Sequence, residues 1–450
     1  MARVGDELTS GAGLREPPAE EVPEVIDVVA AGAPPELVAQ TLGGYLRAWG
    51  QRIRGGDSGA LPVIFALAVI AVAFEVWTGG LFFSPGNLVN LFEASLVFMT
   101  LGMAEIFVLL LGEIDLSAGY VLAVGAGIAG ILVQKPGADL PWWLAVIIAL
   151  LCTAVTGGLW GTLVARLHLP SFVVTLAGLL IMWGVMLVIL GNAGAISISS
   201  PILTNQHVLY EFVNGEVPPL AGWIALAVLA AVFGTAVWTR DMGRRRRGLV
   251  APPPGVTLVK IAIAVLAGVA VVAICNVNRG AVAAVVEGVP WVVPIVLAVL
   301  FIWMMLLQRT RFGRYVYAIG GNPDAARRAG VSLVRVRTWG FVLAGLTAGF
   351  AGIVYLSWQG GTSTNVNGGE YVLYGVAAAV IGGTSLFGGR GKVSQAVLGG
   401  LVIGAIYNGL YLQGVQVQWQ LIATGGVLLA AVLIDTLSRR GALTGSVTRM

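Results

Sequence analysis

The chain has 450 residues, of which 57% are hydrophobic and 11% are charged, and its formal net charge is +4. A soluble globular protein carries about 25% charged residues, so this composition excludes a water-soluble surface over most of the chain. Apolar windows as long as a membrane-spanning helix, about 20 residues, recur between residues 61 and 437. The short alternating segments of a membrane β-barrel do not occur. The pattern predicts an all-α polytopic membrane protein.

Residues 1–58 are expected to form a cytoplasmic, largely disordered extension. Residues 1–34 are rich in Ala, Gly, Pro, Glu and Val, and they lack the basic and apolar regions of a signal peptide. Residues 35–54 have the spacing of a basic amphipathic helix at the membrane surface, which Gly43 and Gly44 interrupt. A transmembrane domain is then expected over 59–438, followed by a cytoplasmic tail at 439–450.

Hydropathy predicts ten to twelve spans in this domain, because the segments around 111–118 and 371–394 are interrupted by polar residues. The twelve candidates are 61–80, 89–111, 118–134, 142–165, 170–191, 222–239, 259–276, 291–308, 338–357, 371–387, 394–412 and 418–437.

The distribution of lysine and arginine predicts the orientation of these spans. The connections at 240–258 and 309–337 and the tail are rich in arginine, whereas those at 192–221 and 358–370 contain no Lys or Arg and 277–290 contains only Arg279. Cationic connections remain in the cytoplasm. Twelve spans with both termini in the cytoplasm place every basic connection on that side.

The 309–337 connection contains a predicted short helix. Gly320, Gly321, Asn322 and Pro323 form a turn signal, with Asn322 as the cap and Pro323 at the first helical position. Gly330 can end the helix in the left-handed conformation. A helix with a small-residue face of Ala325, Ala326 and Ala329 and a cationic flank of Arg327 and Arg328 suits docking to a cytoplasmic partner. The alternative is a basic loop that only fixes the topology.

The stretch "LLLGEIDLSAG" places Glu113 and Asp115 inside a run that is otherwise apolar. Gly112 can end one helix, and Asp115 or Ser117 can cap the next. Irregular backbone at membrane depth is tolerated where it lines a cavity or is buried in protein. The break therefore either lines a translocation path or forms a plain turn near the cytoplasmic face. "GGTSLFGGRG" (382–391) has a similar layout, which hints at a pseudo-repeat.

Four segments, "GEIDLSAG", "LPSFVVTLAGLLIMWG", "YAIGGNPDAARRAGVSLVRV" and "VIGGTSLFGGRGKVSQAVLGGLVIGAIYNGL", resemble the permease subunits of bacterial sugar ABC importers. The resemblance is to the ribose/xylose/galactose branch, and most of all to its D-xylose subgroup, over roughly residues 60–437. The N-terminal extension departs from the family pattern.

The resemblance implies a multi-pass protein of the bacterial plasma membrane that imports a monosaccharide by alternating access. It implies a permease homodimer bound to two ATPase subunits and an extracytoplasmic sugar-binding protein, with membrane lipids around it and no nucleic-acid partner. The segment from Gly321 to Gly330 would be the coupling helix. D-xylose is the expected solute, with ribose, galactose or an inositol as alternatives.

A sugar path needs hydroxyl, amide and carboxylate groups, and polar residues inside apolar spans are functional candidates because they are costly there. The alternative for each Ser or Thr is a bond to its own helix, and Asn408 can instead pair with another helix. The candidates are Glu105, Glu113, Asp115, Ser117, Ser171, Thr175, Thr384, Ser385 and Asn408.

No catalytic or nucleotide-binding pattern is readable. In the only phosphate-loop lookalike, Gly391 and Lys392 are followed by Val393, where a hydroxyl residue is required. Cys152, Cys275, His168 and His207 are isolated, so no disulfide framework or metal site is expected. We expect no cofactor on this chain, with ATP and magnesium on the ATPase subunit. A self-sufficient secondary transporter and a membrane-embedded enzyme are the alternatives from other classes.

Overall fold

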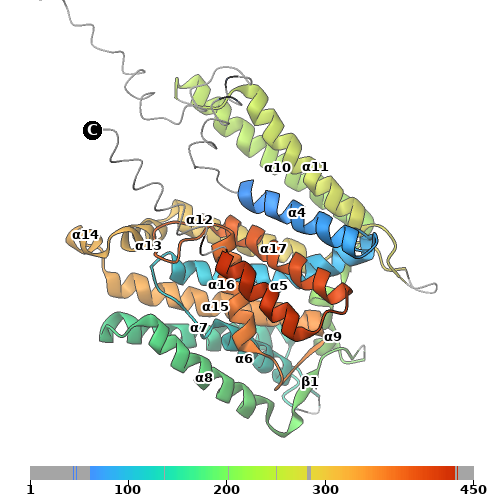
Figure 1. The fold of residues 1–450 in the computed structure, drawn as a ribbon, viewed down its shortest axis with the longest axis vertical. Coiled ribbons are helices and arrows are strands. Elements are labelled where there is room, and N and C mark those ends of the chain that lie inside the picture. Colours follow the sequence, from blue (N-terminus) through green and yellow to red (C-terminus); the bar gives the residue numbers. More distant parts are fainter. Residues whose placement is uncertain are drawn as a thin grey trace, which may run out of the picture. The chain divides into compact units, whose positions relative to one another are not determined.

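The computed structural model describes residues 61–430 apart from 136, 201, 250 and 281–284, and in addition residues 44, 47 and 433. Helices dominate this part of the chain (Figure 1). The predicted N-terminal extension (1–58), its amphipathic helix and the tail (439–450) lie outside the described residues, apart from 44 and 47.

Within the described ranges, eight helices are long and apolar enough to cross a membrane. They are α5 (Pro85–Leu109), α7 (Trp142–Leu167), α8 (Ser171–Leu190), α10 (Pro219–Arg246), α11 (Pro254–Cys275), α12 (Val292–Arg309), α15 (Leu333–Gln359) and α17 (Val393–Leu412).

Four shorter apolar helices complete the set: α4 (Leu61–Trp77), α6 (Ala118–Leu132), α16 (Gly368–Ile381) and the helix Val417–Ala430. Each of these twelve helices coincides with one of the twelve predicted segments, and the predicted all-α polytopic architecture is confirmed.

Shorter elements lie in the connections. They are the 3₁₀ turn η1 (Gly191–Ala193), α9 (Thr204–Asn214), α13 (Arg311–Gly321), α14 (Pro323–Arg328), β1 (Ala195–Ser197), β2 (Glu216–Val217), β3 (Val289–Pro290) and β4 (Gly361–Ser363). The strands pair antiparallel as β1 with β4 and β2 with β3. These two ladders join the three cation-poor connections, as expected if all three lie on one side. Figure 1 shows β1 and α9 at the end of the bundle opposite α14.

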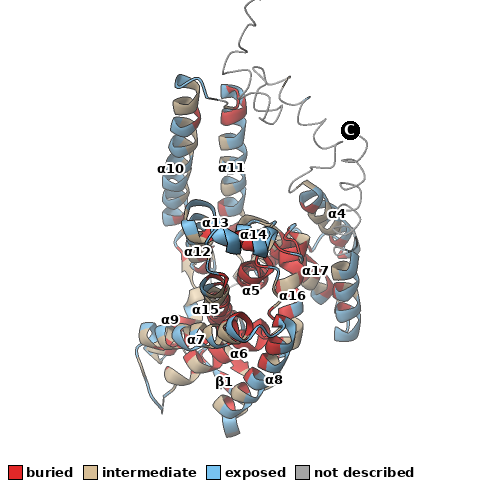
Figure 2. Ribbon diagram, turned by 90° about the vertical axis from the view of Figure 1, so that its left-hand side faces the viewer, coloured by how far each residue is buried: buried red, intermediate tan, exposed pale blue. Residues whose placement is uncertain are grey.

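Helix α5 is the centre of the larger packing unit (Figure 2). From Ala94 to Leu109 every residue of α5 is buried. The neighbouring helices approach closely through small residues, as is common inside membranes, where no hydrophobic effect drives helices together and close van der Waals packing must do so. A Cβ at Gly157 of α7 would lie 2.1 Å from the carbonyl oxygen of Phe341 in α15, and one at Gly345 of α15 would lie 2.4 Å from that of Thr153.

The described residues form two compact units, of which the smaller contains residues 231–263 and the larger contains the rest from residue 61 onward. In the smaller unit the ends of α10 and α11 are joined through a buried threonine. Thr257 donates a hydrogen bond to Asp241 at 2.9 Å and accepts one from Arg245 at 2.6 Å. Arg245 also donates to the carbonyl oxygen of Pro252.

Some predicted boundaries are wrong, for local reasons. Helix α10 continues to Arg246, so most arginines of the 240–258 connection are helical. Helix α15 begins at Leu333, five residues before the predicted span. Helix α16 ends at Ile381 instead of 387, because Gly383 has φ +97° and turns the chain out of the helix.

Replacing Gly399 by Ala should destabilise the packing of α17 on α16. The new Cβ would lie 1.8 Å from the carbonyl oxygen of Ala378, and such overpacking costs about 1–3 kcal/mol. Thermal unfolding of the purified protein measures the effect. Gly184→Ala is the matched control, since no atom lies within 4 Å of that Cβ position. Equal melting temperatures for the two variants would contradict the packing.

Candidate functional site

The α5–α6 break begins with a glycine in the left-handed conformation. Gly112 has φ +77°, its N–H donates to the carbonyl oxygen of Leu109 at 2.9 Å, and the N–H of Glu113 donates to that of Val108 at 3.0 Å. This is the hydrogen-bond pattern of a Schellman helix end. The prediction that Gly112 ends the first helix is confirmed.

Asp115 organises the start of α6. Its Oδ1 accepts hydrogen bonds from the Ser117 backbone N–H at 2.9 Å and from the Ser117 hydroxyl at 2.6 Å. Both residues are buried. Ser117 occupies the cap position, but its hydroxyl makes no capping bond to α6. The carboxylate therefore holds Ser117, the residue that precedes α6, in place. It does not itself cap a backbone N–H of α6.

The first two turns of α8 supply hydrogen-bond partners for peptide groups of the break that have no helical partner. The Ile114 N–H donates to the Ser171 hydroxyl at 3.2 Å. The Thr175 hydroxyl donates to the Ser171 carbonyl oxygen of its own helix at 2.9 Å, as the alternative expected, and it also lies 3.1 Å from the Ile114 carbonyl oxygen. Irregular backbone away from water needs such partners. Asp115, Ser117, Ser171 and Thr175, predicted separately from the sequence, therefore come together at one joint.

Glu113 belongs to a different contact. Its Oε1 lies 3.2 Å from Nε of Arg337, and the two side chains are only 12% and 22% exposed. Arg337 is the last residue of the predicted 309–337 connection and lies in the second turn of α15. Glu113 therefore ties the break to the start of α15.

The α16–α17 break (382–392) is a second irregular segment with polar residues. The Ser385 N–H donates to the Arg390 carbonyl oxygen at 2.8 Å, and the Ser385 hydroxyl accepts from the Phe387 N–H at 3.0 Å. Thr384 is buried against Gly391, and its hydroxyl finds no hydrogen-bond partner among the described residues. These two predicted residues shape the turn itself.

The two breaks are in direct contact. The Gly389 N–H donates to the Leu110 carbonyl oxygen at 2.9 Å, and Gly112 faces the Phe387 carbonyl. Asn408 does not join them. Its amide exchanges two hydrogen bonds with Asn87 of α5, each 3.0 Å long, so it pairs two helices as the alternative expected.

Two further buried polar groups lie in this core. Both carboxylate oxygens of Glu105 lack a hydrogen-bond partner among the described residues. The indole N–H of Trp160 lacks one there as well. The Trp160 ring and Ser117 both lie beside Gly178, so the indole faces the break. Trp160 could not be predicted as part of the site, because an isolated Trp in an apolar helix carries no local signal.

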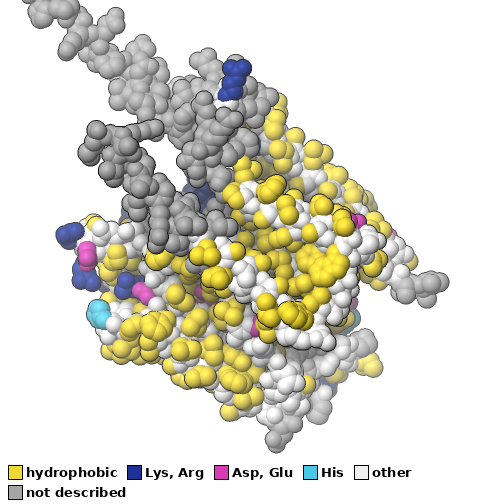
Figure 3. Space-filling model, in the orientation of Figure 1, with side chains coloured by type: hydrophobic (Ala, Val, Ile, Leu, Met, Phe, Trp, Pro, Cys, Tyr) yellow, Lys and Arg dark blue, Asp and Glu magenta, His cyan; other side chains and the backbone are white. Residues whose placement is uncertain are grey.

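Helix α14 confirms the predicted cap and stop. The Asn322 side chain accepts from the Ala325 N–H at 2.9 Å, Pro323 is the first helical residue and Gly330 has φ +82°. The exposed residues of this segment are Gly321, Asn322, Pro323, Asp324, Ala325, Arg327, Arg328, Ala329 and Gly330. Figure 3 shows Lys and Arg gathered at this end of the molecule.

Two details of this segment were predicted wrongly. Gly320 and Gly321 are the last residues of α13 and not part of a turn, since α13 runs up to the cap. Ala326 is 5% exposed and packs inward, so the outward small-residue face consists of Ala325 and Ala329.

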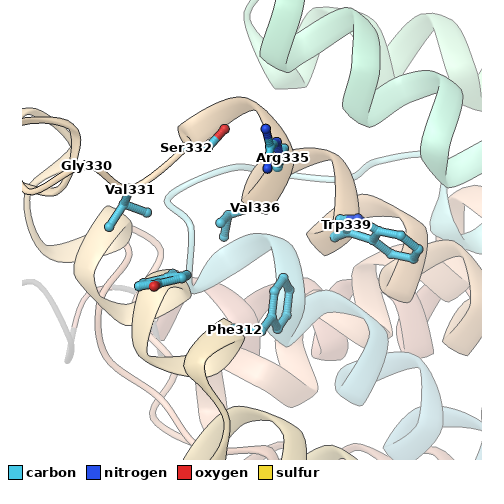
Figure 4. Close-up of a pocket in the computed structure, with 8 residues that line it drawn as sticks. Phe312, Gly330, Val331, Ser332, Arg335, Val336 and Trp339 are labelled. Carbon is cyan, nitrogen blue, oxygen red and sulfur yellow. The ribbon is translucent and has the colours of Figure 1, made fainter.

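A pocket of about 370 Å³ opens beside α14, between α13 and the start of α15. Figure 4 shows Phe312, Val331 and Val336 around it, with Arg335 and Trp339 at its rim. Trp339 is 58% exposed although α15 is mostly buried. This pocket could not be predicted from the sequence, because it depends on the angle between α13 and α15.

Comparison with known proteins identifies one matching family, described as the branched-chain amino acid transport system / permease component, over residues 87–432. The xylose transport system permease protein of Haemophilus influenzae is 33% identical over 382 residues, covering 84% of this chain and 96% of that protein. Its Escherichia coli counterpart is 32% identical, covering 84% and 92%. The D-allose transport system permease protein of Escherichia coli is 29% identical, covering 83% and 90%. No solved structure matches.

Two substitutions at Asp115 separate a structural role from a role of its charge. Asn keeps an acceptor for Ser117, whereas Ala removes it, so Asp115→Ala should lower the melting temperature by more than Asp115→Asn does. If the carboxylate lines the predicted sugar path, Asp115→Asn should also lower solute uptake in reconstituted vesicles at normal expression. Normal uptake by Asp115→Asn would show that Asp115 only stabilises the start of α6 and does not line the path.

Proposed function

Because this chain belongs to the permease family of branched-chain amino acid transport systems, we propose that it forms the membrane-spanning pathway of an ATP-driven importer for a monosaccharide. Its family relatives are transport permeases, so the chain is a transport subunit and not an enzyme. The apolar helices agree with a multi-pass protein of the inner membrane.

The observation that carries the proposal is the exposed helix α14. It is too short to be stable alone, yet a cap, a proline and the buried side chain of Ala326 hold it in place. Its outward face offers small residues and two arginines. This arrangement suits a groove on an ATPase subunit that supplies acidic residues, and the pocket beside α14 can receive an apolar side chain of that subunit.

ATP and magnesium then bind to the ATPase subunits, and hydrolysis displaces α14. The end of the bundle that carries α14 faces the cytoplasm, as do both termini. A sugar-binding protein delivers the solute at the opposite end, where two short β-ladders hold three connections together. Opening passes from one side of the membrane to the other by alternating access.

We propose that the assembly contains two copies of this permease. Helix α8 exposes large apolar side chains along its whole length, including Phe172, Leu180 and Val188. Such a surface needs either lipid or a second copy against it. The remaining apolar faces contact membrane lipids.

The proposed solute is D-xylose. The two xylose permeases named above are 33% and 32% identical to this chain, against 29% for the D-allose permease. These differences are small, and a fructose import permease of Rhizobium meliloti is 30% identical. Ribose, galactose or an inositol are the alternatives, and the binding protein carries most of the selection between them.

Exchanging the segment 322–330 for a Gly/Ser linker should abolish co-purification with the ATPase subunit and leave membrane insertion intact. A milder pair of variants is Arg327→Glu with Arg328→Glu, which reverses the charge on α14. Arg166→Glu is the matched control, because Arg166 is exposed in the last turn of α7 and not on α14. An ATPase complex that survives the linker exchange would contradict the docking role.

Uptake by vesicles that contain the permease, the ATPase and the binding protein identifies the solute and the energy source. Labelled D-xylose should accumulate only with ATP inside, and unlabelled D-xylose should compete better than ribose, allose or fructose. Preferential competition by another sugar would replace the solute but keep the class. Uptake by the permease alone, driven by an ion gradient, would overturn the class in favour of a secondary transporter.

A further inference from the structure

The end of α13 is wedged against both helix breaks. A Cβ at Gly320 would lie 1.8 Å from the Leu110 carbonyl oxygen, in the first break, and 2.4 Å from the Gly389 nitrogen, in the second. No side chain larger than hydrogen fits there. Three segments far apart in the sequence therefore meet at one point, with backbone against backbone.

Hydrogen bonds connect the same three segments. The Gly389 N–H donates to the Leu110 carbonyl oxygen, and one turn before Gly320 the Tyr317 hydroxyl donates to the Gly391 carbonyl oxygen at 2.8 Å. Tyr317 is partly buried, and burial raises the pKa of its hydroxyl, so the proton needed for this bond stays in place at physiological pH. Gly391 in turn packs on Thr384.

Only one residue separates α13 from α14. Asn322 follows Gly321 directly, its N–H donates to the Ala318 carbonyl oxygen, and its side chain caps α14. The chain has no slack at this point, so a displacement of α14 must also move the end of α13.

The other side of α14 leads to the first break as well. After Gly330 the chain enters α15, where Arg337 forms its ion pair with Glu113. Helix α14 is thus connected to the α5–α6 break through α13 and through α15. It reaches the α16–α17 break through Tyr317 and Gly320.

We propose that Tyr317 and Gly320 are positioning residues that transmit the displacement of α14 to both helix breaks at once. This inference depends on the proposed function, in which the ATPase moves α14. Both breaks contain glycines with positive φ, namely Gly112, Gly383, Gly388, Gly389 and Gly391, whereas no residue of α5, α6, α16 or α17 has a positive φ. A push at the end of α13 is therefore absorbed at the breaks, where α6 and α17 begin, and changes the direction of these helices.

The experiment compares Tyr317→Phe and Gly320→Ala in vesicles that contain the whole transporter, with three readouts. These are co-purification with the ATPase, ATP hydrolysis and the solute imported per ATP hydrolysed. Tyr317→Phe removes one hydrogen bond and keeps the ring, so assembly and hydrolysis should remain while the solute imported per ATP falls roughly fivefold. Gly320→Ala should lower this ratio further.

Two substitutions serve as controls. Tyr411→Phe removes the same hydroxyl from a side chain that is 70% exposed, and Gly184→Ala adds a methyl group where no atom is within 4 Å. Both should leave the solute imported per ATP unchanged.

An unchanged ratio in Tyr317→Phe would overturn the proposal, as would loss of the ATPase complex in that variant, since Tyr317 would then act in docking. If Gly320→Ala fails to fold, Tyr317→Phe alone decides. Failure of the proposed function appears differently, because the wild-type permease would then not bind the ATPase at all.

Discussion

The rest of the structure depends on how the peptide groups of two broken helices are satisfied inside the protein. Helix α6 has 15 residues and is about 22 Å long, which is less than the roughly 30 Å of a bilayer core. An irregular segment is therefore needed at or near membrane depth. Ser171, Thr175 and Asp115 supply the hydrogen bonds that a regular helix would have supplied itself. The polar residues of the break are needed because the backbone there has left the helix.

The second break solves the same problem with glycines and a partner segment. Helix α16 has 14 residues, and the loop after it folds back so that Gly389 donates to Leu110 of the first break. Each break thus covers part of the other, and the end of α13 packs against both of them. The layout similarity that hinted at a pseudo-repeat has a physical counterpart here, since both segments end a helix, turn on glycines and meet in one place.

Features that depend on nearby residues could be predicted from the sequence. Hydropathy located the twelve apolar helices found among the described residues, and the Asn322–Pro323 cap and the glycine stops at 112 and 330 need only neighbouring residues. Contacts between distant segments could not be predicted. Gly320 is suited to a turn by composition, but it lies in a helix, where its lack of a side chain allows Leu110 to approach. The partner of Asn408 is 321 residues away in the sequence. The sequence around Tyr317 does not indicate a role for its hydroxyl, because the acceptor, the Gly391 carbonyl oxygen, comes from a distant segment.

The end of the bundle opposite α14 contains two exceptions to the uneven distribution of Lys and Arg between the connections. Two cations, Lys135 and Arg279, lie in connections at that end, and the Gln134 side chain donates to Ser197 of β1 there. Both cations are paired within the protein, Lys135 with Asp139 at 3.3 Å and Arg279 with Glu216 in a largely buried ion pair.

Burial raises the pKa of the Glu216 carboxyl, and the Arg279 guanidinium opposes that rise, so each charge depends on the other. The orientation of a membrane protein follows the number of Lys and Arg residues in its short connections and not their net charge, and the arginines around α14 outnumber the two cations at the opposite end. The asymmetry between the two ends therefore remains when Lys135 and Arg279 are counted. It supports a cytoplasmic position for α14, where ATP is available to a partner subunit.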